Sequence, residues 1–323
     1  MHFLTNPLVK LALQHFDRLD PDPPQNGDWF FETFGPGNSL NATDRPHERF
    51  QDYEQLLKLL FDKDRKKYEK IHKGTPFYFL AWLAFDLRKY EKALFYIDAA
   101  ISEDVRHAGD TWIDGPAAAF LKLDYRDEVA ERVIRKIHDL LSAKLDRFNG
   151  VSNLKAISVN EFLSKCVSPL IDTVSTRTIV SAFYIFLLEF EERLEELSLR
   201  STEGGSIGTL ISHMFNGGLI FESLLKHGYP STRTLTLGKI FQKPDFINDF
   251  CPGISTTATS LKGILDAIID DTMETAFNTT AKLRNTTGHN LVWDDIFDNS
   301  ANYEDLVNQE LNALFYVIQR KFL

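Results

Sequence analysis

The chain has 323 residues, of which 43% are hydrophobic and 25% charged, and its formal net charge is −10. This composition is typical of a folded protein with a sizeable core, and the length predicts two domains. An acidic chain is a poor general binder of polyanions, because phosphate contacts depend on Lys and Arg. No run approaches the ~18 uninterrupted apolar residues of a membrane span, and the first residues show neither the basic segment nor the cleavage site of a secretory signal. We therefore expect a cytoplasmic protein that does not enter a membrane.

The N-terminal half is predicted to be helical after a long irregular arm. Residues 17–48 are rich in Pro, Gly, Asn and Asp, and helical spacing begins near Phe50. The stretch 76–104 resembles one tetratricopeptide-type helix pair, with Arg88 where that repeat usually has a glycine. A solenoid needs about three such repeats and only one copy is visible, so we expect a helical platform that could hold a protein partner.

The C-terminal half is predicted to contain four long helices. They cover residues 176–199, 207–227, 256–283 and 303–322. The last of these places apolar residues on one stripe, as an amphipathic helix does. No run shows the alternation of apolar and polar residues that indicates strands. We therefore predict an all-α protein with an N-terminal region at 1–157 and a C-terminal helical domain at 158–323.

A short basic motif lies between the last two predicted helices. It reads Arg284-Asn285-Thr286-Thr287-Gly288-His289. An arginine, four to six residues and a histidine between two long helices resembles the signature of the HEPN superfamily, whose helical domains occur in RNA-cleaving toxins and antiviral effectors. A polar residue commonly follows that arginine, and Asn285 fits.

The resemblance implies a metal-independent ribonuclease. A histidine with a pKa near neutrality can take or give a proton while the RNA 2′-hydroxyl attacks the neighbouring phosphate. A guanidinium can hold that phosphate and offset its developing charge. Carried onto this chain, His289 is the general acid or base, Arg284 binds phosphate and Asn285 orients it. Residues five apart point about 140° away from each other on a helix, so one motif does not place both side chains on the same phosphate. In the HEPN superfamily two motifs face each other in a homodimer, and the resemblance implies the same arrangement here.

Other interpretations of the same residues stay open. Arg284 could cap the carbonyl end of its helix, while His289 could have only the structural role of forming hydrogen bonds within a loop. Asp294, Asp295 and Asp298 are either a hard-cation site or, as we favour, the acidic start of a helix.

The functional alternatives follow from charge. Residues 160–323 carry 13 Lys and Arg against 21 Asp and Glu. This balance favours a catalytically silent helical scaffold that dimerises or binds a protein, RNA or nucleotide partner. A phosphorylated small ligand held without turnover is a third possibility.

The sequence contains no motif for a metal or a cofactor. Neither a zinc spacing nor a dinucleotide fingerprint appears, and the two cysteines, Cys166 and Cys251, have no metal or redox spacing. We accordingly expect no cofactor and no metal.

Overall fold

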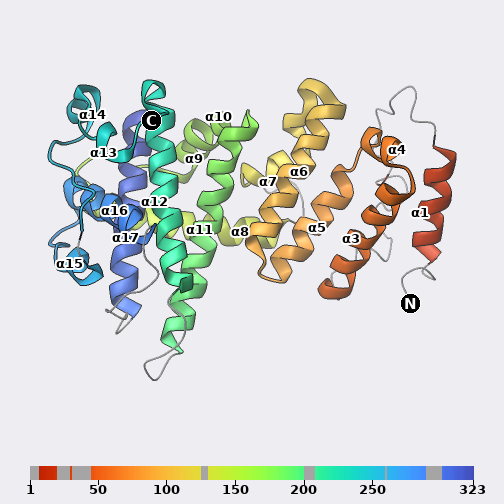
Figure 1. The fold of residues 1–323 in the computed structure, drawn as a ribbon, viewed down its shortest axis with the longest axis horizontal. Coiled ribbons are helices and arrows are strands. Elements are labelled where there is room, and N and C mark those ends of the chain that lie inside the picture. Colours follow the sequence, from red (N-terminus) through yellow and green to blue (C-terminus); the bar gives the residue numbers. More distant parts are fainter. Residues whose placement is uncertain are drawn as a thin grey trace. The chain divides into compact units, whose positions relative to one another are not determined.

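The computed structural model describes residues 7–19, 30, 45–124, 130–199, 208–258, 260–288 and 300–323. All regular structure in these ranges is helical, with no strand, so the predicted all-α class is confirmed (Figure 1). Within the same ranges, no helix combines the length and the apolar character needed to cross a bilayer.

The chain divides into two compact units, Met1–Arg135 and Lys136–Leu323. The division falls inside helix α8 (Glu131–Val151), whereas the sequence predicted a boundary after residue 157. Most of the predicted irregular arm at 17–48 lies outside the described residues.

The first unit is built on a hairpin of two helices, α5 and α6, which correspond to the predicted pair at 76–104. Alanines on both helices are buried, including Ala84 and Ala93, and they let the two backbones approach closely. The helices of this unit are α1 (Pro7–Arg18), α3 (Pro46–Lys63), α4 (Arg65–Lys70), α5 (Gly74–Asp86), α6 (Tyr90–Ala108), the 3-10 helix η3 (Gly109–Asp114) and α7 (Pro116–Leu121).

Helix α5 ends in a left-handed turn at Arg88. Its φ is +53°, in the region that favours glycine. The amide of Arg88 donates to the carbonyl of Phe85, and the amide of Lys89 donates to that of Ala84, which is the hydrogen-bond pattern of a Schellman motif. Arg88 therefore holds a backbone conformation that glycine would adopt without strain.

We expect Arg88→Gly to raise the free energy of unfolding by about 0.5–1 kcal/mol, because glycine adopts the left-handed conformation without the steric cost that an L side chain carries. Chemical denaturation of the two proteins measures the difference. Arg88→Ala is the matched control, since it removes the same guanidinium and keeps the strained conformation. Equal stability of the Gly and Ala variants would contradict the explanation.

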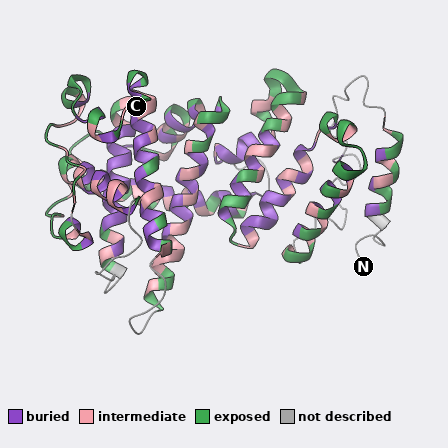
Figure 2. Ribbon diagram, in the orientation of Figure 1, coloured by how far each residue is buried: buried purple, intermediate pink, exposed green. Residues whose placement is uncertain are grey.

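The second unit is a bundle around helix α17. Every residue from Leu306 to Ile318 is buried, and α17 packs against α11, α12 and α16 (Figure 2). The helices of this unit are the greater part of α8, α9 (Val159–Phe162), a π-helical turn (Leu163–Val167), α10 (Ser168–Ile171), α11 (Val174–Ser198), α12 (Gly208–Gly228), the 3-10 helix η5 (Pro230–Thr232), α13 (Leu237–Ile240), α14 (Pro244–Asp249), α15 (Leu261–Leu265), α16 (Met273–Thr287) and α17 (Ser300–Lys321).

The prediction of one long helix over 256–283 is wrong. The structure has the short helix α15, a connection at 266–272 and then α16. Two hydroxyl side chains start the separate helices: Ser260 accepts the amide of Gly263, and Thr272 accepts that of Thr275. Such side chains compete with the backbone for its hydrogen bonds and favour helix starts over helix interiors.

Candidate functional site

The predicted Arg–His motif begins in the last turn of α16. Arg284 and Asn285 belong to this helix, which ends at Thr287 with Gly288 as the C-cap. His289 lies outside the described residues. The helix therefore ends two positions before the predicted general acid or base.

Glycines hold the end of α16 against α12. A Cβ added at Gly218 would lie 2.4 Å from Cβ of Arg284 and 3.0 Å from its Cα. One added at Gly288 would lie 2.8 Å from Cε2 of Phe215, one turn earlier on α12. Real Cβ contacts are not this short, so the two helices meet at this level only because Gly218 has no side chain. The base of the Arg284 side chain is thus fixed on the α12 backbone.

One carboxylate joins Arg284 to a second cation. Glu222, one turn beyond Gly218 on α12, has Oε2 2.7 Å from Nε of Arg284 and Oε1 2.6 Å from Nζ of Lys226. The Glu222 side chain is 9% exposed. The Nε–H of Arg284 does not point at Oε2, so this contact is an ion pair rather than a hydrogen bond. Arg284 and Lys226 thus share the carboxylate of Glu222, and these three residues, the Glu222 cluster, carry a local charge of about +1.

The far end of the Arg284 side chain remains available. The side chain is 29% exposed, and among the described residues nothing pairs with Nη1 or Nη2. These two nitrogens form the fork that binds a carboxylate or phosphate through two parallel hydrogen bonds. Arg284 is therefore held at Nε and open at the end that recognises oxyanions.

Asn285 points to a different part of the unit. Its Nδ2 donates to the carbonyl of Thr256 at 3.1 Å. The amide anchors the segment before α15 to the last turn of α16. A role for Asn285 in orienting phosphate stays a prediction.

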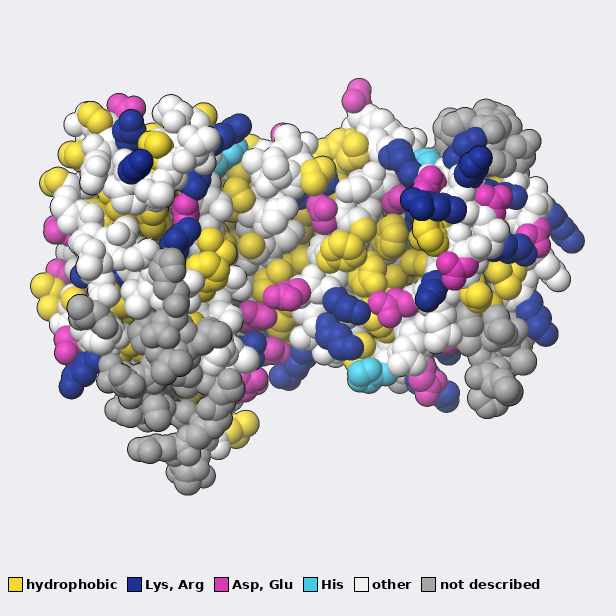
Figure 3. Space-filling model, in the orientation of Figure 1, with side chains coloured by type: hydrophobic (Ala, Val, Ile, Leu, Met, Phe, Trp, Pro, Cys, Tyr) yellow, Lys and Arg dark blue, Asp and Glu magenta, His cyan; other side chains and the backbone are white. Residues whose placement is uncertain are grey.

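The surface charge is mixed rather than concentrated. On the face drawn in Figure 3, the described Lys and Arg side chains lie among Asp and Glu side chains over each unit. Residues 160–323 carry 13 Lys and Arg against 21 Asp and Glu, so binding of a polyanion at Arg284 would depend on local cations rather than on a net positive charge.

His213 is a buried, structural histidine. It is 1% exposed, stacks on Phe186 with ring centroids 4.3 Å apart, and has Nε2 2.8 Å from the Phe186 carbonyl. A carbonyl only accepts, so Nε2 carries the proton and Nδ1 accepts from the Tyr303 hydroxyl at 2.7 Å. Burial lowers the pKa of His213 to about 4. The ring is neutral at pH 7 and is engaged on both sides, so it is no candidate for the reacting histidine.

The depressed pKa makes stability depend on pH. The unfolded chain takes up a proton at this histidine near pH 6.5, whereas the folded protein does so only near pH 4. The stabilising effect of the neutral ring is complete above pH 6.5 and is lost as the pH falls toward 4. Between pH 7 and 5.5 we expect the wild type to lose about 1 kcal/mol more unfolding free energy than His213→Gln. Urea denaturation at both pH values measures the two losses, and equal losses would refute this assignment.

Sequence reasoning missed the buried polar residues of α17. Among them Glu310 has no exposed surface, and neither carboxyl oxygen has a hydrogen-bond partner in the described part of the chain. Burial raises its pKa well above the usual range. A Cβ at Gly217 would lie 2.6 Å from Oε2, so this glycine makes the space that the carboxyl group fills. The adjacent glycines Gly217 and Gly218, in a helix without a turn at that point, were the signal that two close contacts occur there.

Comparison with known proteins gave no match to a family model, to a curated protein or to a solved structure. The chemistry of the α16 terminus is therefore inferred from its own side chains. Those side chains pair Arg284 with Glu222 of the neighbouring helix and leave its two terminal nitrogens without a partner among the described residues.

Proposed function

We propose that the end of α16 is the phosphate-binding half of a metal-independent endoribonuclease site of HEPN type. The observation that supports this is the state of Arg284, paired through Nε with Glu222 and open at Nη1 and Nη2. A guanidinium fixed in this way loses little freedom when it binds phosphate, so more of its interaction is available to the transition state.

The proposed reaction is an internal transfer at phosphorus. The RNA 2′-oxygen bonds to the adjacent phosphorus, the bond to the 5′-oxygen breaks, and the products are a 2′,3′-cyclic phosphate and a 5′-hydroxyl. His289 either removes the proton from the 2′-hydroxyl while solvent water protonates the leaving 5′-oxygen, or protonates that oxygen while water takes up the 2′-hydroxyl proton. Arg284 offsets the negative charge that grows on the phosphate oxygens.

A second copy of the chain completes the proposed site. α16 ends at Thr287, before position 289, so the proposed need for a second copy rests on the resemblance to the HEPN superfamily, in which two motifs face each other. One motif would thus supply the guanidinium to a phosphate and the other its histidine. A homodimer with the two α16 termini facing each other satisfies this requirement, and a strictly monomeric protein would contradict it.

Cleavage of mixed RNA in the presence of a chelator tests the proposal. We expect products that end in 2′,3′-cyclic phosphate, and a rate reduced at least about 100-fold in Arg284→Ala and His289→Ala. Arg284→Lys should also be impaired, because it keeps the charge and loses the fork. Arg233→Ala, an exposed arginine of the same unit, is the matched control and should cleave like the wild type.

A silent scaffold is the second candidate, and two observations favour it. The Glu222 cluster is also what an interhelical ion network that only stabilises the unit would look like. The acidic balance of residues 160–323, with 13 Lys and Arg against 21 Asp and Glu, also disfavours RNA as the ligand. An intact dimer that cleaves no RNA, in which Arg284→Ala lowers thermal stability, would support the scaffold and refute the nuclease.

A further inference from the structure

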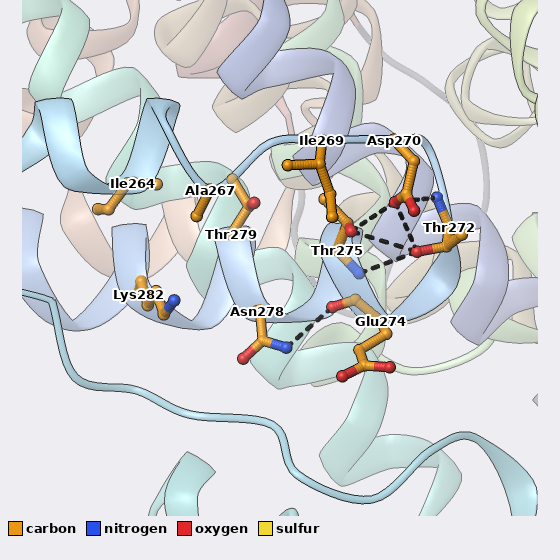
Figure 4. Close-up of a pocket in the computed structure, with 10 residues that line it drawn as sticks. All are labelled: Ile264, Ala267, Ile269, Asp270, Thr272, Glu274, Thr275, Asn278, Thr279 and Lys282. Atoms are coloured by element: carbon orange, nitrogen blue, oxygen red, sulfur yellow. Dashed lines mark hydrogen bonds between the residues drawn. The ribbon is translucent and has the colours of Figure 1, made fainter.

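A cavity of about 360 Å³ lies between α16 and the connection that precedes it (Figure 4). It exists because the chain breaks into α15 and α16 instead of forming one helix. Its apolar wall consists of Ile264, Ala267 and Ile269. Its size falls in the range of small-molecule sites, which are lined by apolar groups and a few polar ones.

The opposite wall is one polar face of α16. Thr275, Asn278, Thr279 and Lys282 all line the cavity. Their spacing of three, four and seven residues places them on the same side of the helix. Arg284 lies two residues further on, about 200° round the axis from Lys282, so the cavity is separate from the Glu222 cluster.

Thr279 lines the cavity and has a hydroxyl group without a partner among the described residues. The residue is 3% exposed, and no described residue forms a hydrogen bond with its hydroxyl. In Figure 4 its side chain rises from α16 toward Ala267. Its neighbours are already engaged: the Thr275 hydroxyl donates to Asp270 at 2.5 Å, and Asn278 donates to the Glu274 carbonyl at 3.1 Å. The Thr279 hydroxyl is therefore a donor that a ligand in the cavity can use.

Lys282 places a positive charge in the same cavity. Nothing in the described part of the chain is paired with its ammonium group. Two acidic residues also line the cavity, but neither opposes Lys282 closely. The carboxylate of Asp270 accepts hydrogen bonds from Thr272 and Thr275, and Glu274 lies eight residues away, about 12 Å along the helix.

We propose that this cavity binds a small organic anion with an apolar ring. The acidic group, a phosphate monoester or a carboxylate, pairs with Lys282 and accepts the Thr279 hydroxyl proton in a hydrogen bond. The ring lies against Ala267 and Ile269, the two exposed apolar residues of the lining. Such a site is independent of RNA cleavage.

Calorimetric titration with phenyl phosphate and with benzoate tests this site and identifies the acidic group. We expect at least one of them to bind, and to bind more tightly than inorganic phosphate or phenol, which each supply half of the contacts. Lys282→Met should weaken the binding about tenfold or more. Lys243→Met is the matched control, since it removes an exposed lysine of the same unit that does not line the cavity.

Thr279→Val separates binding from folding. Valine has nearly the same shape and removes a hydroxyl that has no partner, so the melting temperature should be kept or raised while the affinity falls about threefold or more. Absence of binding by both anions up to about 5 mM, the weak end of specific affinity, would overturn the proposal. So would equal affinity for inorganic phosphate, or affinity unchanged in Lys282→Met. None of these measurements depends on nuclease activity.

Discussion

Asp271→Ala is expected to lower the free energy of unfolding by about 3 kcal/mol. One carboxyl oxygen of Asp271, Oδ1, accepts three hydrogen bonds and ties the connection before α16 to the core. The donors are Gln309 Nε2 at 2.9 Å, Asn312 Nδ2 at 3.0 Å and Arg147 Nη2 at 3.1 Å. Gln309 and Asn312 are 2% and 1% exposed, so water cannot replace the acceptor. Removing the carboxylate leaves buried donors unsatisfied, and this cost is larger than the value of the bonds themselves.

Urea denaturation at pH 7 measures the change. Asp266→Ala is the control, because this exposed aspartate lies in the same connection and should alter the free energy by less than about 0.5 kcal/mol. If the two alanine variants are equally stable, Asp271 does not organise the core as described. Asp271→Asn should fall between them, since it keeps one acceptor and loses the charge that Arg147 faces.

The sequence predicts a helix correctly where the apolar spacing is helical and the segment is long enough to form several turns. The pair at 76–104, the helix at 176–199 and the last helix are all present as α5 and α6, α11 and α17. The break between α15 and α16 was missed because Ile264, Ile268 and Phe277 continue an apolar spacing across it. The sequence did contain a signal, Asp270-Asp271-Thr272, whose short polar side chains are typical of a helix start. The apolar spacing across 256–283 favours one continuous helix, and it is a more prominent pattern than the helix-start signal at these three residues.

The site was predictable only in part. Arg284 and its position at a helix end follow from the local motif, but Glu222 lies 62 residues away and its approach depends on Gly218. A contact across two helices is set by packing, which a single sequence does not specify. The same limit applies to α17: the sequence predicts an amphipathic helix, whereas Asn308, Gln309 and Glu310 are buried in a helix that α11, α12 and α16 contact.

Substitution of Glu310 is expected to have the opposite effect to substitution of Asp271, because removing the Glu310 carboxyl group should raise the free energy of unfolding. The carboxyl group is fully buried without a described partner, and such a group costs about 1–3 kcal/mol. Methionine has a similar length and no hydrogen-bonding requirement, so Glu310→Met should raise the unfolding free energy by about 2 kcal/mol at pH 5. The gain should be larger at pH 8. Because burial raises the pKa in the folded protein, the unfolded chain ionises first as the pH rises and the wild type is destabilised.

Glu310→Gln distinguishes the two causes of this instability. The amide cannot ionise, yet it is as poorly partnered as the neutral acid. It should therefore exceed the wild type by only about 1 kcal/mol at pH 5 and by more at pH 8, the gain growing by up to about 1.4 kcal/mol for each pH unit above the pKa of the unfolded chain and below that of the folded one. Equal stability of wild type and Glu310→Gln at both pH values would show that the carboxyl group is not held in its neutral form. A loss of stability in both variants would mean that Glu310 has a binding partner in the folded protein, and that Gly217 makes room for that contact rather than for an isolated acid.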